Sequence, residues 1–239
     1  MKKAFMKAIG LAIAISALKT SAIQASTLAT GRSAPHPDRI MVEYYGASSV
    51  VGVNGAMPSK IARPNSVQQF ALRTKQPVEG HGVNGTSAMD LLYGTGGHRP
   101  AWKQRMLASR ASHVIIVAGI NDWRYDIPTF KKALAQLVLT AQGAGKQVVL
   151  QTTQPTAQRL SGGSDESDRE VANRAGAVRE LGAEIGVPVI DVHTYLTNYA
   201  MEHGKQIAEM MPDGLHPAPW VYLLIGDYAA EQFAALVPK

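Results

Sequence analysis

The sequence predicts an α/β protein, a three-layer α/β/α sandwich built around a mostly parallel sheet. Five short apolar or β-branched runs indicate strands, at residues 39–45, 78–81, 113–118, 147–152 and 187–191. Helical patterns fill stretches between these runs, so strands and helices alternate along the chain. This alternation is typical of a parallel sheet covered by helices on both faces, with right-handed connections.

Three of the helices can be placed from their apolar periodicity. Residues 128–144 begin with a proline and repeat apolar side chains at helical spacing, namely Phe130, Leu134, Leu137, Val138 and Ala141. Residues 165–185 follow a loop at 161–164 and open with acids, which suit a helix N-terminus. A last helix is expected over 219–236.

The N-terminal residues predict a signal peptide over 1–25. Lys2, Lys3 and Lys7 precede an apolar run at 8–18, and small residues follow it. The run is too short for a membrane span, so we expect cleavage, after Ala22 or Ala25, and no stable membrane anchor. The protein would then be exported, either periplasmic or secreted. An uncleaved anchor or a helix of the fold is the alternative.

Residues 26–38 are rich in Ser, Thr, Gly and Pro and predict a linker, which places a single domain at 39–239. The net charge is +6, but the first 25 residues hold four lysines and no acid, so the rest carries +2. No basic stripe remains that would indicate nucleic-acid binding. The chain has no cysteine, which excludes disulfides and thiol chemistry.

Polar blocks follow three of the predicted strands, where sites form in parallel sheets. Ser48 lies in a Gly-Ala-Ser turn, which suits a nucleophile but is also common at a helix N-cap. Gly85 belongs to a Gly-Val-Asn-Gly block whose amides could point into a cleft, and Asn121 offers a side-chain amide in a Gly-Ile-Asn-Asp block. Each of these two blocks could equally be a simple turn.

A fourth block near the C-terminus places Asp213 three residues before His216. One tight loop can therefore pair the carboxylate with a ring nitrogen of the histidine. A serine hydroxyl is a poor nucleophile on its own, and a histidine held by a carboxylate can take its proton. These two residues supply both parts of that device.

The four blocks, in this order, resemble the SGNH hydrolase superfamily, also called the GDSL lipases and esterases, from residue 39 to about 228. The resemblance implies Ser48 as nucleophile, His216 as general base and acid, and Asp213 as the carboxylate that orients it. It also implies an oxyanion hole made by the amides of Ser48 and Gly85 and the side chain of Asn121. The family fold is similar to the predicted sheet, with five parallel strands in the flavodoxin-like order 2-1-3-4-5.

The chain departs from the family pattern at one position of the serine block. Ala47 stands where the family usually has an aspartate, so any hydrogen bonds of that carboxylate are missing. Ser49 is a rival nucleophile at a variable position of the block, and His193, close to Asp191, is a rival base that follows the fifth strand.

Several further residues near the blocks have alternative interpretations. Trp123 and Trp220 follow the asparagine and histidine blocks and are candidates for the wall of an acyl or sugar pocket, with core packing as the alternative. His81, His98 and Asp90 lie near the glycine block, but no metal-ligand spacing joins them, so we expect no metal.

The sequence thus predicts an exported serine esterase that hydrolyses small acyl or acetyl esters through an acyl-enzyme on Ser48, without a cofactor. A polysaccharide O-acetyl esterase of the same fold and a catalytically idle glycan- or acyl-binding module are the alternatives. The expected partner is a small-molecule or glycan ester. A nucleotide-binding domain is disfavoured because no phosphate loop or dinucleotide motif opens the first helix.

Overall fold

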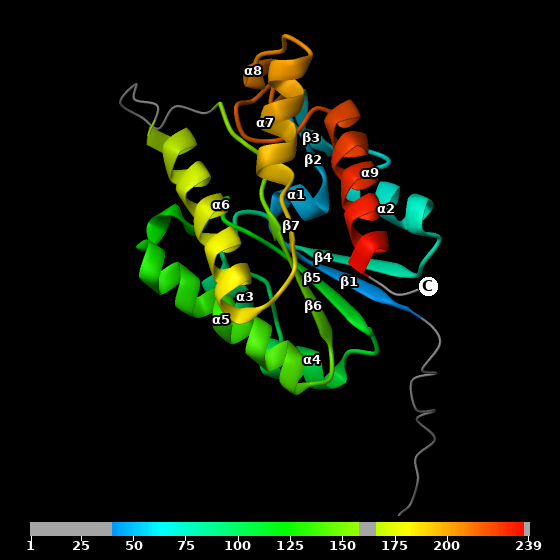
Figure 1. Cartoon of the computed structure of the whole chain (residues 1–239), viewed down its shortest axis with the longest axis vertical. Coiled ribbons are helices and arrows are strands. Elements are labelled where there is room, and N and C mark those ends of the chain that lie inside the picture. Colours follow the sequence, from blue (N-terminus) through cyan, green and yellow to red (C-terminus); the bar gives the residue numbers. More distant parts are fainter. Residues whose placement is uncertain (1–39, 158–165, 237–239) are drawn as a thin grey trace, which may run out of the picture. The chain divides into compact units, whose positions relative to one another are not determined.

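The computed structural model describes residues 40–157 and 166–236 of the chain. Its centre is a five-stranded parallel sheet, with the strand order β4-β1-β5-β6-β7 (Figure 1). In that order the strands are Val78–Gly82, Val42–Gly46, His113–Ala118, Gln147–Thr152 and Val189–Ile190. Counted along the five predicted strands, this is the order 2-1-3-4-5, so the flavodoxin-like sheet is confirmed.

The strand boundaries match the sequence best in the middle of the sheet. β5 and β6 begin and end at the predicted residues. β1 starts at Val42 rather than at residue 39, because the Met41 N–H donates to the Ser112 hydroxyl instead of to a neighbouring strand. β7 is shorter than predicted, since Asp191 already caps the helix that follows it.

Helices cover both faces of the sheet, as predicted, and form two layers (Figure 1). One layer holds α2 (Ser66–Thr74), α7 (Val192–Glu202) and α9 (Pro219–Leu236). The other holds α3 (Ala88–Tyr93), α4 (Trp102–Ala108), α5 (Ile127–Gly143) and α6 (Glu166–Ile185). Neighbouring residues of β1 alternate between the layers: Tyr44 packs in the first and Tyr45 in the second.

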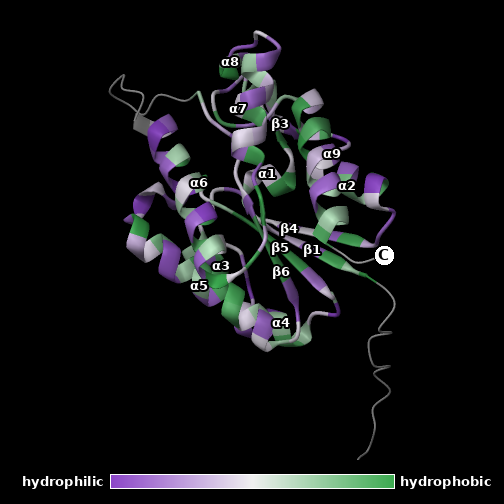
Figure 2. Cartoon of the chain, in the orientation of Figure 1, coloured by the Kyte–Doolittle hydropathy of each residue, from purple (hydrophilic) through white to green (hydrophobic). Residues whose placement is uncertain are grey.

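The predicted helices agree with the structure to within a residue. α5 starts at Ile127 because the Asp126 side chain accepts the Thr129 N–H and caps it, and α9 has the predicted bounds. In Figure 2 hydrophobic and hydrophilic residues alternate along α5, as a helix with one buried face requires. The predicted loop at 161–164, the signal peptide and the linker lie outside the described residues.

Among the elements that the sequence did not predict is a hairpin near the start of the domain. A small antiparallel hairpin, β2 (Val53–Asn54) and β3 (Met57–Ile61), follows the short helix α1 (Ser48–Val51). Its strands are too short to show an alternating pattern, and all of β3 is exposed. The other short elements are η1 (Asp122–Arg124) and α8 (Ile207–Met210). Within the described ranges, no helix is both long and apolar enough to span a membrane.

Candidate active site

Ser48 is the first residue of α1, and the single residue Ala47 separates it from the end of β1. The turn is tight: a Cβ on Gly46 would lie 2.8 Å from the side chain of Val50 and 2.9 Å from the carbonyl oxygen of Val117, so only glycine fits there. Because Ser48 opens a helix, its N–H lies among those that have no partner inside the helix. The sheet edge therefore presents the Ser48 hydroxyl together with an amide that has no acceptor among the described residues.

The loop between α8 and α9 brings His216 and Asp213 to this serine. The Ser48 Oγ lies 2.9 Å from Nε2 of His216, and Nδ1 of His216 lies 2.7 Å from Oδ2 of Asp213. An ionised carboxylate only accepts hydrogen bonds, so Nδ1 carries the proton and Nε2 is left to accept the Ser48 O–H. The convergence expected from the sequence is thus present in the fold.

Asp213 also organises its own loop. Its Oδ1 accepts the amides of Leu215 and His216, at 2.9 and 2.6 Å. Partial burial by itself would raise the pKa of Asp213, but these amide bonds and the bond from the His216 ring outweigh it and hold the pKa below its usual value. The carboxylate therefore stays ionised across the range in which histidine titrates.

Two other segments hold this loop against the sheet. The Gly55 N–H, in the turn of the β2–β3 hairpin, donates to the Pro217 carbonyl at 3.0 Å. Gln154, just after β6, donates from Nε2 to the Leu215 carbonyl at 2.9 Å. The imidazole therefore sits on a segment fixed from both sides.

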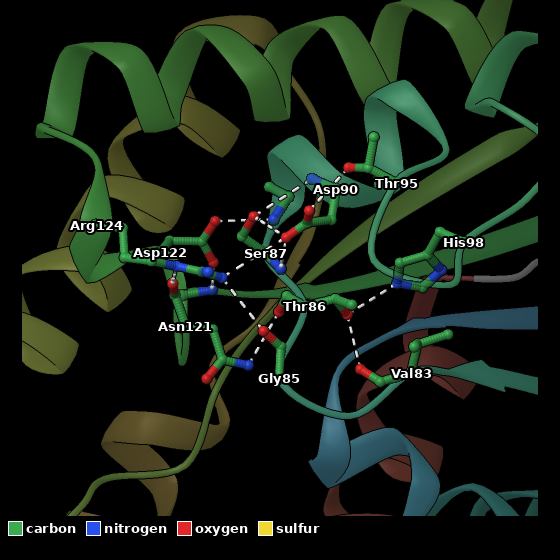
Figure 3. Close-up of polar contacts among 12 residues, drawn as sticks. Val83, Gly85, Thr86, Ser87, Asp90, Thr95, His98, Asn121, Asp122 and Arg124 are labelled. Carbon is green, nitrogen blue, oxygen red and sulfur yellow. Dashed lines mark hydrogen bonds and ion pairs between the residues drawn. The ribbon is translucent and has the colours of Figure 1, made fainter.

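The glycine block lies between β4 and α3. Gly85 has a φ of +71°, a conformation that disfavours any residue with a side chain, although no atom would obstruct a Cβ there. Its carbonyl accepts a bond from Arg124, and the neighbouring Thr86 carbonyl accepts one from Nδ2 of Asn121 at 2.9 Å (Figure 3). No acceptor within residues 40–157 and 166–236 bonds the Gly85 amide.

Asp122 has a structural role that the sequence analysis did not assign. Its buried carboxylate accepts the Ala88 amide at 2.8 Å and the Gly119 amide at 2.9 Å, which ties the start of α3 to the end of β5 (Figure 3). Burial raises its pKa, although the two amides and nearby arginines act in the opposite direction. The one feature of the sequence that could have indicated this role is that Asp122 directly follows Asn121 in the Gly-Ile-Asn-Asp block.

His98 holds the same loop from the other side. Its Nε2 lies 2.9 Å from the Thr86 hydroxyl, whose single proton is donated to the Val83 carbonyl at 2.7 Å (Figure 3). The histidine must therefore donate from Nε2–H. Burial, followed by the charge of Arg105, lowers the pKa of His98 to about 4, so the ring is neutral at pH 7. This bond positions Thr86, the residue that follows Gly85.

The two rivals considered for the triad are placed differently. Ser49 is buried on α1, and its hydroxyl has no partner within the described part of the chain. His193 is the second residue of α7, where its amide donates to the Thr152 hydroxyl and burial lowers its pKa. The His216 ring donates to Asp213 and accepts from Ser48, and neither rival takes part in these bonds.

The two tryptophans lie on elements next to the blocks. Trp123 belongs to η1 and is 52% exposed. Trp220 lies in the first turn of α9, 37% exposed, with its ring 6.2 Å from that of Tyr199 and the Lys205 ammonium 5.5 Å from its centre. The exposure of both rings is compatible with a ligand contact.

The residues considered for a metal do not gather. His98 bonds Thr86, the Asp90 carboxylate accepts the Ser87 N–H in the capping box of α3, and His81 stacks on Tyr45 with ring centres 4.8 Å apart.

A different set, the side chains of Glu43, Glu79 and His81, has donor atoms within 4.8 Å of one another. The Glu43 carboxylate is already bonded by the hydroxyls of Tyr45 and Ser109, which explains its burial without an ion.

Ala47 lies in an apolar environment. It is buried in a small cluster with Ile120 and Val171, and Leu215 packs against them. The site therefore surrounds the position of the missing aspartate with hydrocarbon on these sides.

Residues 43–223 match the model of the GDSL-like lipase/acylhydrolase family. No curated protein matches the chain.

Solved structures similar to this fold include Est24, a carbohydrate acetylesterase from Sinorhizobium meliloti, with a TM-score of 0.63, 15% identity and coverage of 83% of this chain and 100% of that one. The acetyl xylan esterase AlAXEase has a TM-score of 0.64 and 17% identity, with coverage of 83% of this chain and 100% of that one. A lipase/acylhydrolase from Enterococcus faecalis has a TM-score of 0.63 and 21% identity, with coverage of 84% and 98%. At these identities the likeness is one of fold.

Proposed function

The chain belongs to the GDSL-like lipase/acylhydrolase family, which makes it a carboxylic-ester hydrolase, and on this premise we propose that Ser48, His216 and Asp213 are its catalytic triad. The observation that carries the proposal is the continuous chain of hydrogen bonds from the Ser48 hydroxyl through the His216 ring to the Asp213 carboxylate. That chain is the arrangement by which a neutral hydroxyl becomes a nucleophile.

The reaction then has two halves. The Ser48 oxygen attacks the ester carbonyl while its proton passes to Nε2 of His216, and the imidazolium is stabilised by Asp213. The tetrahedral intermediate expels the alcohol, which leaves with that proton, and the acyl group stays on Ser48 as an ester. Water then gives a proton to His216 and attacks the acyl carbon. The acid is released as Ser48 regains its proton.

We assign the oxyanion hole to the amides of Ser48 and Gly85 and to Nδ2 of Asn121. In the part of the chain that the structure describes, neither the Ser48 amide at the start of α1 nor the Gly85 amide has an acceptor, which supports this assignment. Nδ2 of Asn121 has two hydrogens, and one remains after its bond to the Thr86 carbonyl. Each donor of this kind is typically worth about 2.7 to 4 kcal/mol in the transition state.

The proposed substrate is a small acyl or acetyl ester. Among the similar structures are a carbohydrate acetylesterase and an acetyl xylan esterase, which favours acetylated glycans as a second candidate. We further propose that residues 1–25 direct export and are then removed, because a basic start and a short apolar run precede small residues.

Hydrolysis of p-nitrophenyl acetate by the purified mature chain tests the triad. Ser48→Ala should abolish turnover, whereas the matched control Ser49→Ala should keep it. Equal rates for wild type and Ser48→Ala would refute the proposal. A panel of p-nitrophenyl esters of increasing chain length, beside acetylated xylan, then identifies the acyl group and the alcohol. Mass spectrometry of the protein recovered outside the cytoplasm locates the cleavage site, and an intact N-terminus would contradict signal removal.

A further inference from the structure

A trough runs along the outer side of the pair α7 and α9, which lie side by side in one layer (Figure 1). It consists of two hollows of about 420 Å³ each, and Tyr195 and Tyr228 line both of them. Asn198, Tyr199 and Glu202 line the first hollow. We call the two hollows together the α7–α9 trough. Each volume lies within the range of small-molecule sites, roughly 300 to 1,000 Å³.

Aromatic rings form the floor of this trough. The rings of Tyr195 and Tyr228 are parallel, with centres 4.1 Å apart, so each covers one face of the other, and both residues line both hollows. The Tyr199 ring is 6.4 Å from Tyr195, and the Trp220 ring is 6.2 Å from Tyr199. The series of rings thus extends from Tyr228 to Trp220, four residues beyond His216.

Several polar side chains of the trough have no partner among the described residues. Within residues 40–157 and 166–236, the hydroxyls of Tyr195, Tyr199 and Tyr228 make no hydrogen bond with a side chain or the backbone. The side chains of Asn198 and Glu202 likewise have no bonded or ion-paired partner in the part of the chain that the structure describes. Flat rings flanked by free donors and acceptors match the alternating C–H faces and hydroxyls of a sugar chain.

The charged residues that line the trough indicate which class of ligand it can bind. Among the described residues that line it, the cation is Arg73, which Asp227 neutralises at 2.8 Å. Asp191 is paired with Arg179 at 3.2 Å, while Glu202 and Glu231 add negative charge. An anionic ligand would be repelled. An aromatic cage for a cationic ligand needs several ring faces directed at the same point. Tyr195 and Tyr228 instead stack face to face with each other, so they do not form such a cage. A neutral ligand rich in hydroxyl groups fits both observations.

We propose that the α7–α9 trough binds a neutral oligosaccharide, with sugar rings against the tyrosine faces and sugar hydroxyls bonded to Asn198, Glu202 and the phenols. Binding at this site does not depend on catalysis. If the proposed esterase activity also holds, the series of rings ending at Trp220 leads a tethered glycan toward the segment that carries His216.

The test is isothermal titration of the purified protein with three ester-free neutral probes: xylohexaose, cellohexaose and mannohexaose. At least one should bind wild type with a Kd in the range of about 0.1 to 1 mM. The triple variant Tyr195→Phe, Tyr199→Phe and Tyr228→Phe keeps the rings but removes the hydroxyls, and should bind about tenfold more weakly. Tyr93→Phe, at an exposed tyrosine outside the trough, is the matched control and should bind like wild type.

A second variant tests the same site in case the triple tyrosine variant does not fold. Asn198→Ala with Glu202→Ala changes exposed side chains and should also weaken binding. The proposal is overturned if none of the hexasaccharides binds, if both trough variants bind like wild type, or if hexalysine binds in the trough and the saccharides do not. Turnover of p-nitrophenyl acetate by wild type is measured separately. If the protein binds saccharide but does not hydrolyse the ester, the proposed esterase activity is wrong and the proposed saccharide site stands. If it hydrolyses the ester but binds no saccharide, the saccharide site is wrong and the esterase activity stands.

Discussion

Gly55 lies directly against the backbone of His216. A Cβ built on Gly55 would overlap the His216 carbonyl oxygen and come 3.0 Å from Cδ of Pro212, while the Gly55 N–H donates to the Pro217 carbonyl. The hairpin that escaped the sequence analysis therefore serves as a support for the segment that carries the imidazole.

Gly55→Ala should displace this segment. We expect kcat for p-nitrophenyl acetate to fall by about tenfold or more, because a shift of about 1 Å at a catalytic group can cost that much, together with a lower melting temperature. The matched control is Gly143→Ala at the end of α5, where a Cβ meets no atom within 4 Å. That variant should be unchanged in rate and as stable as wild type or more stable. Wild-type kinetics in Gly55→Ala would show that the contact has no catalytic weight.

Asp213→Asn should leave the fold intact and remove most of the activity. The asparagine oxygen can still accept the Leu215 and His216 amides, but its NH2 group would favour the wrong tautomer of the ring. The expected loss in kcat is about ten-thousandfold. Asp126→Asn is the control, because asparagine is an equally good N-cap for α5. A loss in Asp213→Asn of less than tenfold would argue against the assigned orienting role.

Asn121→Ala tests the oxyanion hole. Losing one donor should lower kcat by about a hundredfold to a thousandfold and change KM little, because the bond to the oxyanion strengthens in the transition state. Since Nδ2 also holds the Thr86 carbonyl, a melting curve must accompany the kinetics. An effect confined to KM, or to stability alone, would remove Asn121 from the hole.

His98 should make stability depend on pH between about 6.5 and 4. Its pKa is lowered from 6.5 to about 4 in the folded protein, so over this interval the unfolded chain binds a proton that the native state does not. The free energy of unfolding must then fall as the pH falls, by roughly 1 to 3 kcal/mol.

Urea unfolding at several pH values measures this loss, and His98→Gln provides the comparison. Glutamine can still donate to Thr86 but does not titrate, so its curve should be flatter over the same interval. His113 and His193 also have lowered pKa values and add to the slope, whereas the raised pKa of Asp122 acts in the opposite direction above pH 3.8, and both contributions are present in wild type and variant alike. Identical slopes for wild type and variant would contradict the prediction. The carboxylates with lowered pKa values, such as Asp213, act only near and below pH 3.8.

Ala47→Asp restores the residue usual in the family and should destabilise this protein. The new carboxylate would enter the cluster of Ile120 and Val171 with Leu215 beside it. Burying a polar group without a partner costs more than about 2 kcal/mol, so the melting temperature should drop by several degrees. Ala47→Ser, which introduces a smaller and neutral side chain, is the control and should lose less. If Ala47→Asp were as stable as wild type, water or an unforeseen donor would have to reach this position.

Local patterns in the sequence determined the strands and the longer helices. The runs that became β5 and β6 are apolar and β-branched over most of their length, and the α9 bounds follow from a proline start and an apolar stretch. The pair of Asp213 and His216 was also predictable, because three residues of separation in a tight turn bring an acid to a ring nitrogen.

The tertiary structure decided which of several plausible groups share a site. Ser48 and Ser49 are neighbours in sequence, and only the packing of α1 on the sheet turns Ser48 toward a histidine 168 residues away. The bridging carboxylate of Asp122 and the contact of Gly55 with His216 join segments that no local pattern connects. Backbone propensity acts over a few residues, whereas these contacts depend on how the layers and loops pack. The sequence alone could therefore indicate the catalytic residues but not the residues that hold them in position.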